Sequence, residues 1–415
     1  MAVVKPFKAL RPPEEIAELV ASVPYDVVST EEAKELAQDN PLSFLRVTRS
    51  EIELPADTGI YSREVYNKAD ANLKELQKKG NLKLDNEEHY YLYRLEMKGH
   101  TQVGIAAVFS VDDYDNNVIL KHEKTRKVKE DDRTNHIVAT NAQTGTVFLT
   151  YKGVPAVNNI VNKTVSESDP VYDFTAADGI KHSIWILPGE DNKILQDEFA
   201  KVKNLYIADG HHRAASASRA RKIKKDANPD HNGNEDYNYF LAVIFPAEQV
   251  KILPYNRIIH NLNGLTAEEF LKGISEKFIV AKSEQKEPGQ KRSFGMFLDG
   301  EWYLLKTKDS INASLSLSGS ISGTLDVSIL QDFLFNPVLG IDDQRTNQNI
   351  DFIGGIRGTK ELEKLVNRGD ASAAFTFYPV SVEELMKISD AGEIMPPKST
   401  WFEPKLRDGL LIYLI

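Results

Sequence analysis

Five consecutive residues in the middle of the chain, Asp209-Gly210-His211-His212-Arg213, carry several of the side-chain types that enzymes use for chemistry. A carboxylate can hold a metal ion, an imidazole can move a proton near neutral pH, and a guanidinium binds phosphate through paired hydrogen bonds. The alternative is an ordinary Asp-Gly turn before a solvated basic helix. Binding and catalytic residues often lie on loops that a rigid scaffold positions, so we interpret this segment as a functional site.

The residues around this segment predict a strand, a glycine turn and a helix. Leu205 to Ala208 is a short apolar run with strand character, and an Ala/Ser/Arg-rich run follows Gly210. A helix start offers backbone amides and the positive end of the helix dipole to an anion. We therefore predict that Gly210 and Arg213 bind phosphate and that Asp209 binds a metal ion. Asp209, His211 and His212 are the candidate catalytic residues of the turn.

A second charged segment begins at His122. If it were helical, four basic residues would share one face, which would be repulsive unless it met an anion or carboxylates: His122, Arg126, Lys129 and Arg133. Two interpretations stay open, a phosphate-binding face and a solvated helix neutralised by its own acids. On the first, Arg126 and Arg133 bind phosphate, Glu123 is a catalytic carboxylate and His122 is a further candidate.

Two other segments add candidates. Asp26 follows Tyr25 near the N-terminus, where a simple turn is the alternative. The run from Met395 to Lys405 holds three prolines, which would make a rigid segment presenting Lys398 and Lys405, or a stiff loop over a sheet edge. Its Lys-Ser-Thr lacks the glycines of a P-loop. We expect the His122–Arg133 and Asp209–Arg213 segments to line one cleft, with Lys398 near its rim.

Composition narrows the class of protein. The chain of 415 residues is 41% hydrophobic and 27% charged, as soluble globular proteins are, and is long enough for two domains. The absence of cysteine excludes disulfides, thiolate metal sites and cysteine nucleophiles. A formal charge of −10 would repel a polyanion, so we do not expect a nucleic-acid partner. Without an apolar run of membrane-spanning length or a signal peptide, we expect a cytoplasmic protein with no membrane contact.

The pattern of elements predicts an α+β fold of mixed sheets with hairpins and packed helices. Helices are expected at 29–39, after a capping box, and at 62–80; strands at 44–48 and 205–208; and hairpins at 89–110 and 294–306. The polar loop 226–238 is the predicted boundary between an α+β domain, residues 1–225, and a second α/β region, residues 239–415.

Several of these segments together resemble a widespread bacterial family catalogued as a domain of unknown function. The resemblance rests mainly on ADGHHR at 208–213 and PPKSTWF at 396–402, with the segments around Asp26, Glu123 and Arg257. The DGHHR portion is also similar to a motif of the ParB/sulfiredoxin-like superfamily, which includes CTP-hydrolysing partition proteins, sulfiredoxins and free serine kinases. This wider resemblance implies a ParB/sulfiredoxin-like core, and Arg257 is a further site candidate.

The resemblance implies a nucleotide-phosphate site at this turn, carried over to Asp209, Gly210, His212 and Arg213. In the kinase branch the acid of the motif works with magnesium and a separate carboxylate activates the hydroxyl of serine. Glu123 and Asp26 are candidates for that base on chemistry alone. Sulfiredoxin activity needs a cysteine, which this chain lacks.

The leading hypothesis is a magnesium-dependent enzyme that uses a nucleoside di- or triphosphate, as a kinase of a small hydroxyl compound such as free serine would. One alternative is a DNA-associated, ParB-like nucleotide-binding module, which the acidic balance disfavours. Another is a metal-dependent phosphohydrolase using His122, Glu123, His211 and His212. The small-molecule substrate, the nucleotide and the oligomeric state are left open.

Overall fold

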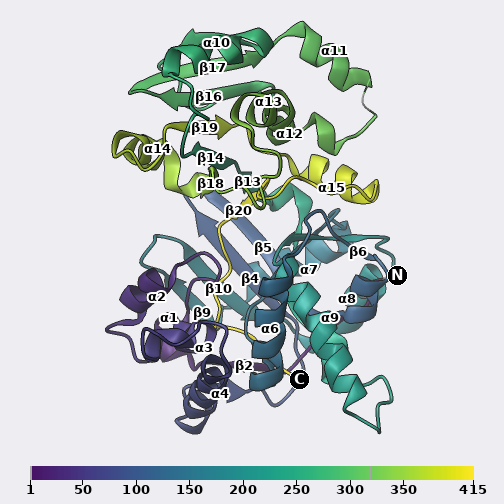
Figure 1. Cartoon of the computed structure of the whole chain (residues 1–415). Helices are drawn as coiled ribbons and strands as arrows, with labels where there is room; N and C mark the ends of the chain where they lie inside the picture. Colours follow the sequence, from purple (N-terminus) through teal and green to yellow (C-terminus); the bar gives the residue numbers. More distant parts are fainter. Residues whose placement is uncertain (1, 318) are drawn as a thin grey trace. The chain divides into compact units, whose positions relative to one another are not determined.

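The computed structural model describes residues 2–317 and 319–415 (Figure 1). The chain forms two compact units. The first consists of Met1–Lys121, Thr125–Val250 and Pro404–Ile415, and the second of His122–Lys124 and Lys251–Glu403. The loop 226–238 lies inside the first unit, since the strand after it joins the first unit's sheet. The proposal that residues 1–225 and 239–415 are separate domains stays a prediction.

A nine-stranded mixed sheet forms the centre of the first unit. Its strands follow the order β6 (Ile119–Leu120), β11 (Leu205–Asp209), β8 (Val147–Tyr151), β12 (Tyr239–Pro246), β5 (His100–Ser110), β4 (Tyr91–Met97), β10 (Lys181–Ile186) and β9 (Tyr172–Thr175), with β1 (Val4–Lys5) paired to β5. The pairs β11–β6 and β12–β8 are parallel, and the others are antiparallel. The strands that carry the sequence motif therefore lie near one edge of this sheet.

A four-stranded sheet and nine α-helices complete the first unit over its described residues. The small sheet has the order β3 (Lys83–Leu84), β2 (Ala9–Arg11), β21 (Ile412–Leu414) and β7 (Ala142–Gln143). The helices are α1 (Ala17–Val20), α2 (Thr30–Ala37), α3 (Leu45–Thr48), α4 (Arg63–Lys78), α5 (Val111–Asp115), α6 (Lys127–Thr140), α7 (Pro155–Glu167), α8 (Asn192–Phe199) and α9 (His211–Asp226). Because β21 joins this sheet, the end of the chain returns to the first unit.

Packing of α9 against the sheet positions the candidate site. Its face toward the sheet carries small residues, and Ala214 and Ala217 belong to the core that also holds Leu205 and Ile207 of β11. Small side chains let the helix backbone approach its neighbours closely, and burying such a face removes apolar surface from water. The first turn of α9 is thereby held at the end of β11.

The second unit contains a six-stranded antiparallel sheet. Its order is β15 (Phe278–Lys282), β17 (Glu301–Thr307), β16 (Ser293–Leu298), β19 (Ala373–Phe377), β14 (Tyr255–Ile259) and β18 (Ile350–Gly354), and β13 (Lys251–Leu253) pairs separately with β20 (Trp401–Glu403). Its helices are α10 (Ala267–Lys277), α11 (Asp309–Leu317), α12 (Asp326–Leu330), α13 (Asn336–Leu339), α14 (Gly358–Asn367) and α15 (Val382–Asp390), with a π-helical segment at Gln331–Phe335.

The predicted α+β class with mixed sheets is confirmed. The capping box at Ser29 is present, with reciprocal hydrogen bonds to Glu32, and both predicted hairpins form. Among the described residues, no helix has both the length and the apolar composition that crossing a bilayer requires.

Two local predictions are wrong. Residues 44–48 were expected to form a strand, but Leu45–Thr48 is the helix α3, and Phe44, Leu45 and Val47 are all buried. A short apolar run buried on every side shows no period that separates a strand from a helix. The second error concerns the charged segment: α6 begins at Lys127 with Arg126 at its N-cap, so His122 does not share a helical face with Arg126 and Arg133.

Candidate functional site

The turn between β11 and α9 has the predicted form of strand, glycine and helix. Asp209 is the last residue of β11, Gly210 adopts φ 93° in the left-handed region, and α9 begins at His211. A Cβ at position 210 would strain this backbone and would lie 2.9 Å from Nε of Arg213. Glycine therefore allows both the sharp turn and the close approach of the Arg213 guanidinium to the backbone.

The N-terminal ends of α6 and α9 lie next to one another. The backbone N–H of Arg126, the N-cap of α6, donates to Nε2 of His212 in the first turn of α9 at 2.9 Å. Further pairs follow in the same direction along both helices: Ser216 Oγ with Glu130 O at 3.1 Å, Arg219 Nη2 with Asp131 Oδ1 at 2.5 Å and Lys224 Nζ with Asn141 Oδ1 at 2.5 Å. The helices therefore run parallel, side by side in Figure 1, with both positive dipole ends at the site.

Arg213 is buried beneath this end of α9, with 7% of its surface exposed. Its Nη1 donates to the carbonyl oxygen of Thr146, and its Nη2 lies 3.2 Å from Oδ2 of Asp209. Burial alone would lower the pKa of the guanidinium, but the charges of Asp26, Asp209 and Asp408 raise it above its ordinary value. Arg213 is thus charged. Among the described residues its Nε has no hydrogen-bond partner.

Arg133 is a second cation near Arg213 in the first unit, with 12% of its side chain exposed. Its guanidinium lies 2.9 Å from Asp132 and 4.0 Å from the ring centre of Tyr25, and Nη1 donates to the Thr48 carbonyl. A cavity of about 20 Å³ is lined by Tyr25, Arg133 and Arg213, among others, which is room for about one water molecule and too little for a phosphate group. Any phosphate at this site therefore lies outside the cavity, and contact with Arg133 stays a prediction.

One carboxylate oxygen of Asp209, Oδ2, forms ion pairs with two cationic side chains. Besides Arg213, Lys405 places Nζ 3.1 Å from Oδ2, and the lysine side chain is only 12% exposed. Lys405 belongs to the terminal segment that starts the chain's return to the first unit. The proline-rich sequence indicated a lysine held in a fixed position, but no feature of it indicated Asp209 as the partner.

The two histidines of the turn have different surroundings. His211 is buried, and burial lowers the pKa of its imidazole to about 3, although Asp209 opposes that shift. It is therefore neutral at physiological pH. His212 is half-buried and receives the Arg126 N–H at Nε2, so this nitrogen is the acceptor of a neutral ring. His212 joins the two helix ends, and its predicted catalytic role stays a prediction.

Arg126 and Asp26 are the exposed candidates of the first unit. Arg126 stands at the start of α6, beside His212. Asp26 follows buried Tyr25 in a turn, and its charge contributes to the raised pKa of Arg213. Both side chains are accessible to a ligand that approaches the first turn of α9.

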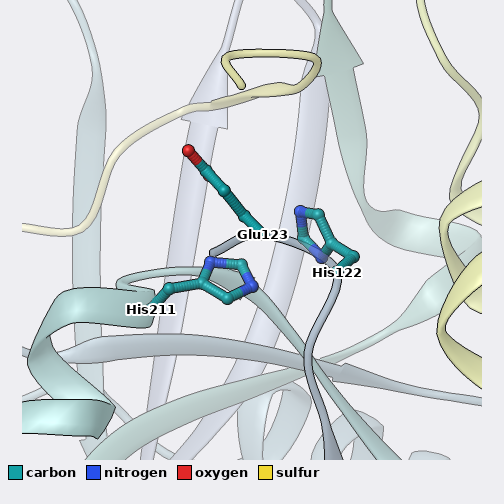
Figure 2. A group of neighbouring side chains, drawn as sticks. All are labelled: His122, Glu123 and His211. Atoms are coloured by element: carbon teal, nitrogen blue, oxygen red, sulfur yellow. The ribbon is translucent and has the colours of Figure 1, made fainter. Parts of the chain in front are cut away.

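The remaining candidates belong to the second unit. The backbone carbonyl of His122 accepts the N–H of Met395 at 2.8 Å, and Lys398 places Nζ 5.4 Å from the ring centre of Tyr255. Figure 2 shows His122 and Glu123 as chain neighbours, and a carboxylate oxygen of Glu123 lies within 4.8 Å of a ring nitrogen of His122. His211, of the first unit, stands at the beginning of α9. The single cleft expected to join these segments stays a prediction, as does a metal site shared by the histidines.

Residues 4–328 match the family described as "Protein of unknown function (DUF1015)". This range covers well over half of the chain and includes the whole Asp209–Arg213 turn. The chain belongs to this family. The predicted membership in a family of unknown function is thereby confirmed, whereas the defining role of the ADGHHR and PPKSTWF motifs stays a prediction. Lys405 and Asp408 lie beyond the matched range.

Three solved structures resemble this DUF1015 protein over 74% of its length. They are a conserved hypothetical protein from Pyrococcus furiosus, at 13% identity, TM-score 0.35 and 95% of that chain; a free serine kinase in complex with AMP, at 14%, 0.35 and 92%; and SbnI with C-terminal truncation from Staphylococcus aureus, at 12%, 0.40 and 87%. No curated protein sequence matches the chain. TM-scores this low carry no argument about the site.

Asp408 is a buried acid of the DUF1015 protein that sequence reasoning missed. It is 2% exposed, and among the described residues its Oδ2 has no hydrogen-bond partner. Burial raises the pKa of this carboxyl to about 7, with Asp26 acting in the same direction, while Arg213, Arg133 and a backbone hydrogen bond from Tyr25 oppose the rise. An Arg-Asp-Gly triplet gives no signal that the aspartate interacts electrostatically with Arg213 and Arg133.

This raised pKa predicts a pH-dependent stability. Between pH 3.8 and about 7 the folded state holds a proton on Asp408 that the unfolded state releases, so the free energy of unfolding should fall as pH rises through this range. Asp408→Asn should reduce that fall by about 1–3 kcal/mol between pH 5 and pH 8, measured by urea unfolding. The exposed control Asp39→Asn should keep the wild-type difference. An unchanged pH dependence in Asp408→Asn would show that this carboxyl is ionised throughout.

Proposed function

We propose that this protein is a magnesium-dependent enzyme that binds a nucleoside di- or triphosphate and transfers a phosphoryl group to a small hydroxyl compound, free serine being the candidate acceptor. The observation that carries the proposal is the pairing of two helix N-termini through Arg126 and His212. Two dipole ends, exposed Arg126 and buried, charged Arg213 together create positive potential at one point. Phosphoryl transfer needs such positive potential around the transferring group.

Each residue of the turn has a distinct part in this proposal. Gly210 lets the first turn of α9 face the phosphates, and Arg126 contacts their outer oxygens. Asp209 fixes Lys405 and Arg213 through its Oδ2, which orients two cations toward the same ligand. Arg213 acts from beneath, since its burial prevents it from reaching a ligand in solvent. Neutral His211 is able to accept a proton, but its burial makes this role depend on ligand access.

The base that activates the acceptor hydroxyl is proposed to be Asp26. It is exposed, lies in the first unit with the turn, and interacts electrostatically with Arg213. Glu123, the other candidate, belongs to the second unit. A carboxylate serves as base when the hydroxyl lies within hydrogen-bond reach in the complex.

The residues around Asp209 are suited to a magnesium ion that is bound to a nucleotide, and not to a bare magnesium ion. Mg²⁺ prefers oxygen ligands and keeps several waters, with phosphates supplying the rest. The Asp209 oxygen that accepts Lys405 and Arg213 is not suited to a bare divalent cation, because both neighbours repel it. The cation would supply charge neutralisation at the phosphates, and Asp209 would approach it through its other oxygen or through water.

Two alternative functions would give different experimental results from those expected of a kinase. The likeness of the DGHHR segment to ParB-type motifs supports a ParB/sulfiredoxin-like core with a nucleotide-binding, DNA-associated role. The formal charge of −10 opposes that role. The second is a phosphohydrolase, in which water replaces the acceptor hydroxyl. It would show nucleotide binding and phosphate release in the absence of any acceptor.

The test is a thermal-shift and calorimetric titration with ATP, ADP, CTP and duplex DNA, each with and without Mg²⁺. We expect a nucleotide with Mg²⁺ to raise the melting temperature. Arg126→Ala should weaken nucleotide binding about tenfold, the loss of one charge-assisted contact of roughly 1.4 kcal/mol. The control Lys193→Ala removes an exposed lysine on α8 and should bind normally. Stabilisation by DNA alone, or equal affinity in Arg126→Ala, would overturn the proposal.

A further inference from the structure

The second unit contains a cavity of about 340 Å³, a volume typical of small-molecule sites. Its walls come from three segments of that unit: residues 123–124, residues 342–345 after α13, and residues 394–397, together with Gln331 of the π-helical segment. Ile394, Met395 and two prolines give one wall an apolar surface, and the other walls are polar. The proposed function does not use this cavity.

A hydrogen-bond network fixes the polar side chains of one wall. Gln344 is buried and donates through Nε2 to Oε1 of Gln331 at 2.7 Å. Gln331 in turn donates to the carbonyl oxygens of Ile341, at 2.7 Å, and Asp342, at 3.2 Å. Side chains locked in this way form a site whose geometry exists before a ligand binds, which reduces the entropy lost on binding.

A buried positive charge stands directly behind this wall. Arg257 is fully buried and donates to Gln344 Oε1 at 3.0 Å and to the carbonyl oxygen of Pro397 at 3.1 Å. Among the described residues, no carboxylate lies within ion-pair distance of it. Burial lowers the pKa of the guanidinium to about 9, so it is still protonated at neutral pH. A buried cation without a counterion is costly, and an anionic group in the cavity would reduce that cost.

Negative charge is concentrated elsewhere on the walls. Asp342 is exposed, and Glu123, which has a carboxylate oxygen within 4.8 Å of a His122 ring nitrogen, also lines the cavity. The third acid, Asp343, is neutralised by Arg345 through bonds of 2.9 and 2.7 Å. Lys124 also lines the cavity, and among the described residues no acidic side chain pairs with it. The cavity thus offers partners for a cationic group and for an anionic group of one ligand.

We propose that this cavity binds a small zwitterion of the α-amino acid class. The ligand's carboxylate interacts with Lys124 and with the field of Arg257 behind Gln344 and Pro397. Its ammonium group interacts with Asp342 and Glu123, and its side chain packs on the apolar wall. The assignment rests on the second unit alone and does not depend on nucleotide binding by the first.

The test is a calorimetric titration of the full chain with each of the common α-amino acids, in the absence of nucleotide. Amino-acid concentrations up to about 10 mM allow a Kd of about 1 mM to be measured. The amino acid that binds best is then compared with its N-acetyl derivative and its methyl ester. Both derivatives should bind at least about tenfold more weakly, because each has lost one of the two charges. Absence of binding by every amino acid would overturn the proposal.

Two variants at exposed positions test which side chain interacts with the ammonium group of the ligand and which with its carboxylate. Asp342→Asn should weaken binding of the amino acid and reduce its preference over the N-acetyl derivative, because only Glu123 then remains for the ammonium group. The preference over the methyl ester should persist. Lys124→Met should give the reverse pattern. The control Asp309→Asn, on α11 outside the cavity, should bind as the wild type does. Equal preferences in both cavity variants, or binding of the methyl ester as tight as that of the amino acid, would contradict the zwitterion site.

Discussion

Asp209→Asn should reduce magnesium-dependent nucleotide turnover by about a thousandfold, comparable to removing one group that stabilises a transition state. Asparagine keeps the shape of the side chain and one acceptor oxygen, but it carries no charge. Lys405 and Arg213 would then lose the anion that orients both of them, and the metal-bound nucleotide would lose a carboxylate. The measurement is the steady-state rate at which the donor nucleotide loses its terminal phosphate, with the nucleotide and the acceptor that support the highest activity.

The stability of this variant separates a catalytic role from a structural one. Because Arg213 is buried, loss of its Asp209 partner should lower the free energy of unfolding by about 1–3 kcal/mol, leaving the protein folded at 25 °C. Lys405→Gln removes the other ion pair of Asp209 and keeps both the carboxylate and its pair with Arg213, so it serves as the matched comparison. Full activity in folded Asp209→Asn would remove this residue from the mechanism.

The parts of the site that sequence could predict are those encoded by neighbouring residues. The apolar run before Asp209, the glycine and the Ala-rich run after it specify a strand, a left-handed turn and a helix without any distant partner. The φ of Gly210 explains why glycine is required there. The α+β class followed in the same way from hairpins and capping signals, such as Ser29 with Glu32.

The partners of this turn could not be predicted, because they are distant in sequence. Arg126 meets His212 across 86 positions, and Lys405 meets Asp209 across 196. Only tertiary packing determines such pairs. The start of α6 could not be predicted either, because basic residues at helical spacing do not indicate where a helix begins. His122 therefore precedes α6 by several residues.

Arg213→Met should cause the largest loss of stability in the first unit. Removing Arg213 takes the nearby cation from Asp408 and leaves Asp209 with Lys405 as its cation, and loss of a buried partner typically costs about 3–5 kcal/mol. Methionine fills much of the volume that the arginine stem occupies, so lost packing contributes little. The free energy of unfolding, measured in urea at pH 8, should fall by this amount, and nucleotide binding should be lost in the fraction that stays folded.

The dependence of this loss on pH identifies its cause. Without Arg213, the pKa of Asp408 should rise further, because the arginine is the first of the groups that hold it down. Asp408 is protonated at pH 5 with or without Arg213 and needs no cation there, whereas at pH 8 Arg213 stabilises its ionised form. Arg213→Met should therefore be destabilised less at pH 5 than at pH 8. The double variant Arg213→Met/Asp408→Asn should recover part of the stability at pH 8. If the loss were equal at both pH values and the double variant recovered nothing, packing rather than charge would explain the role of Arg213.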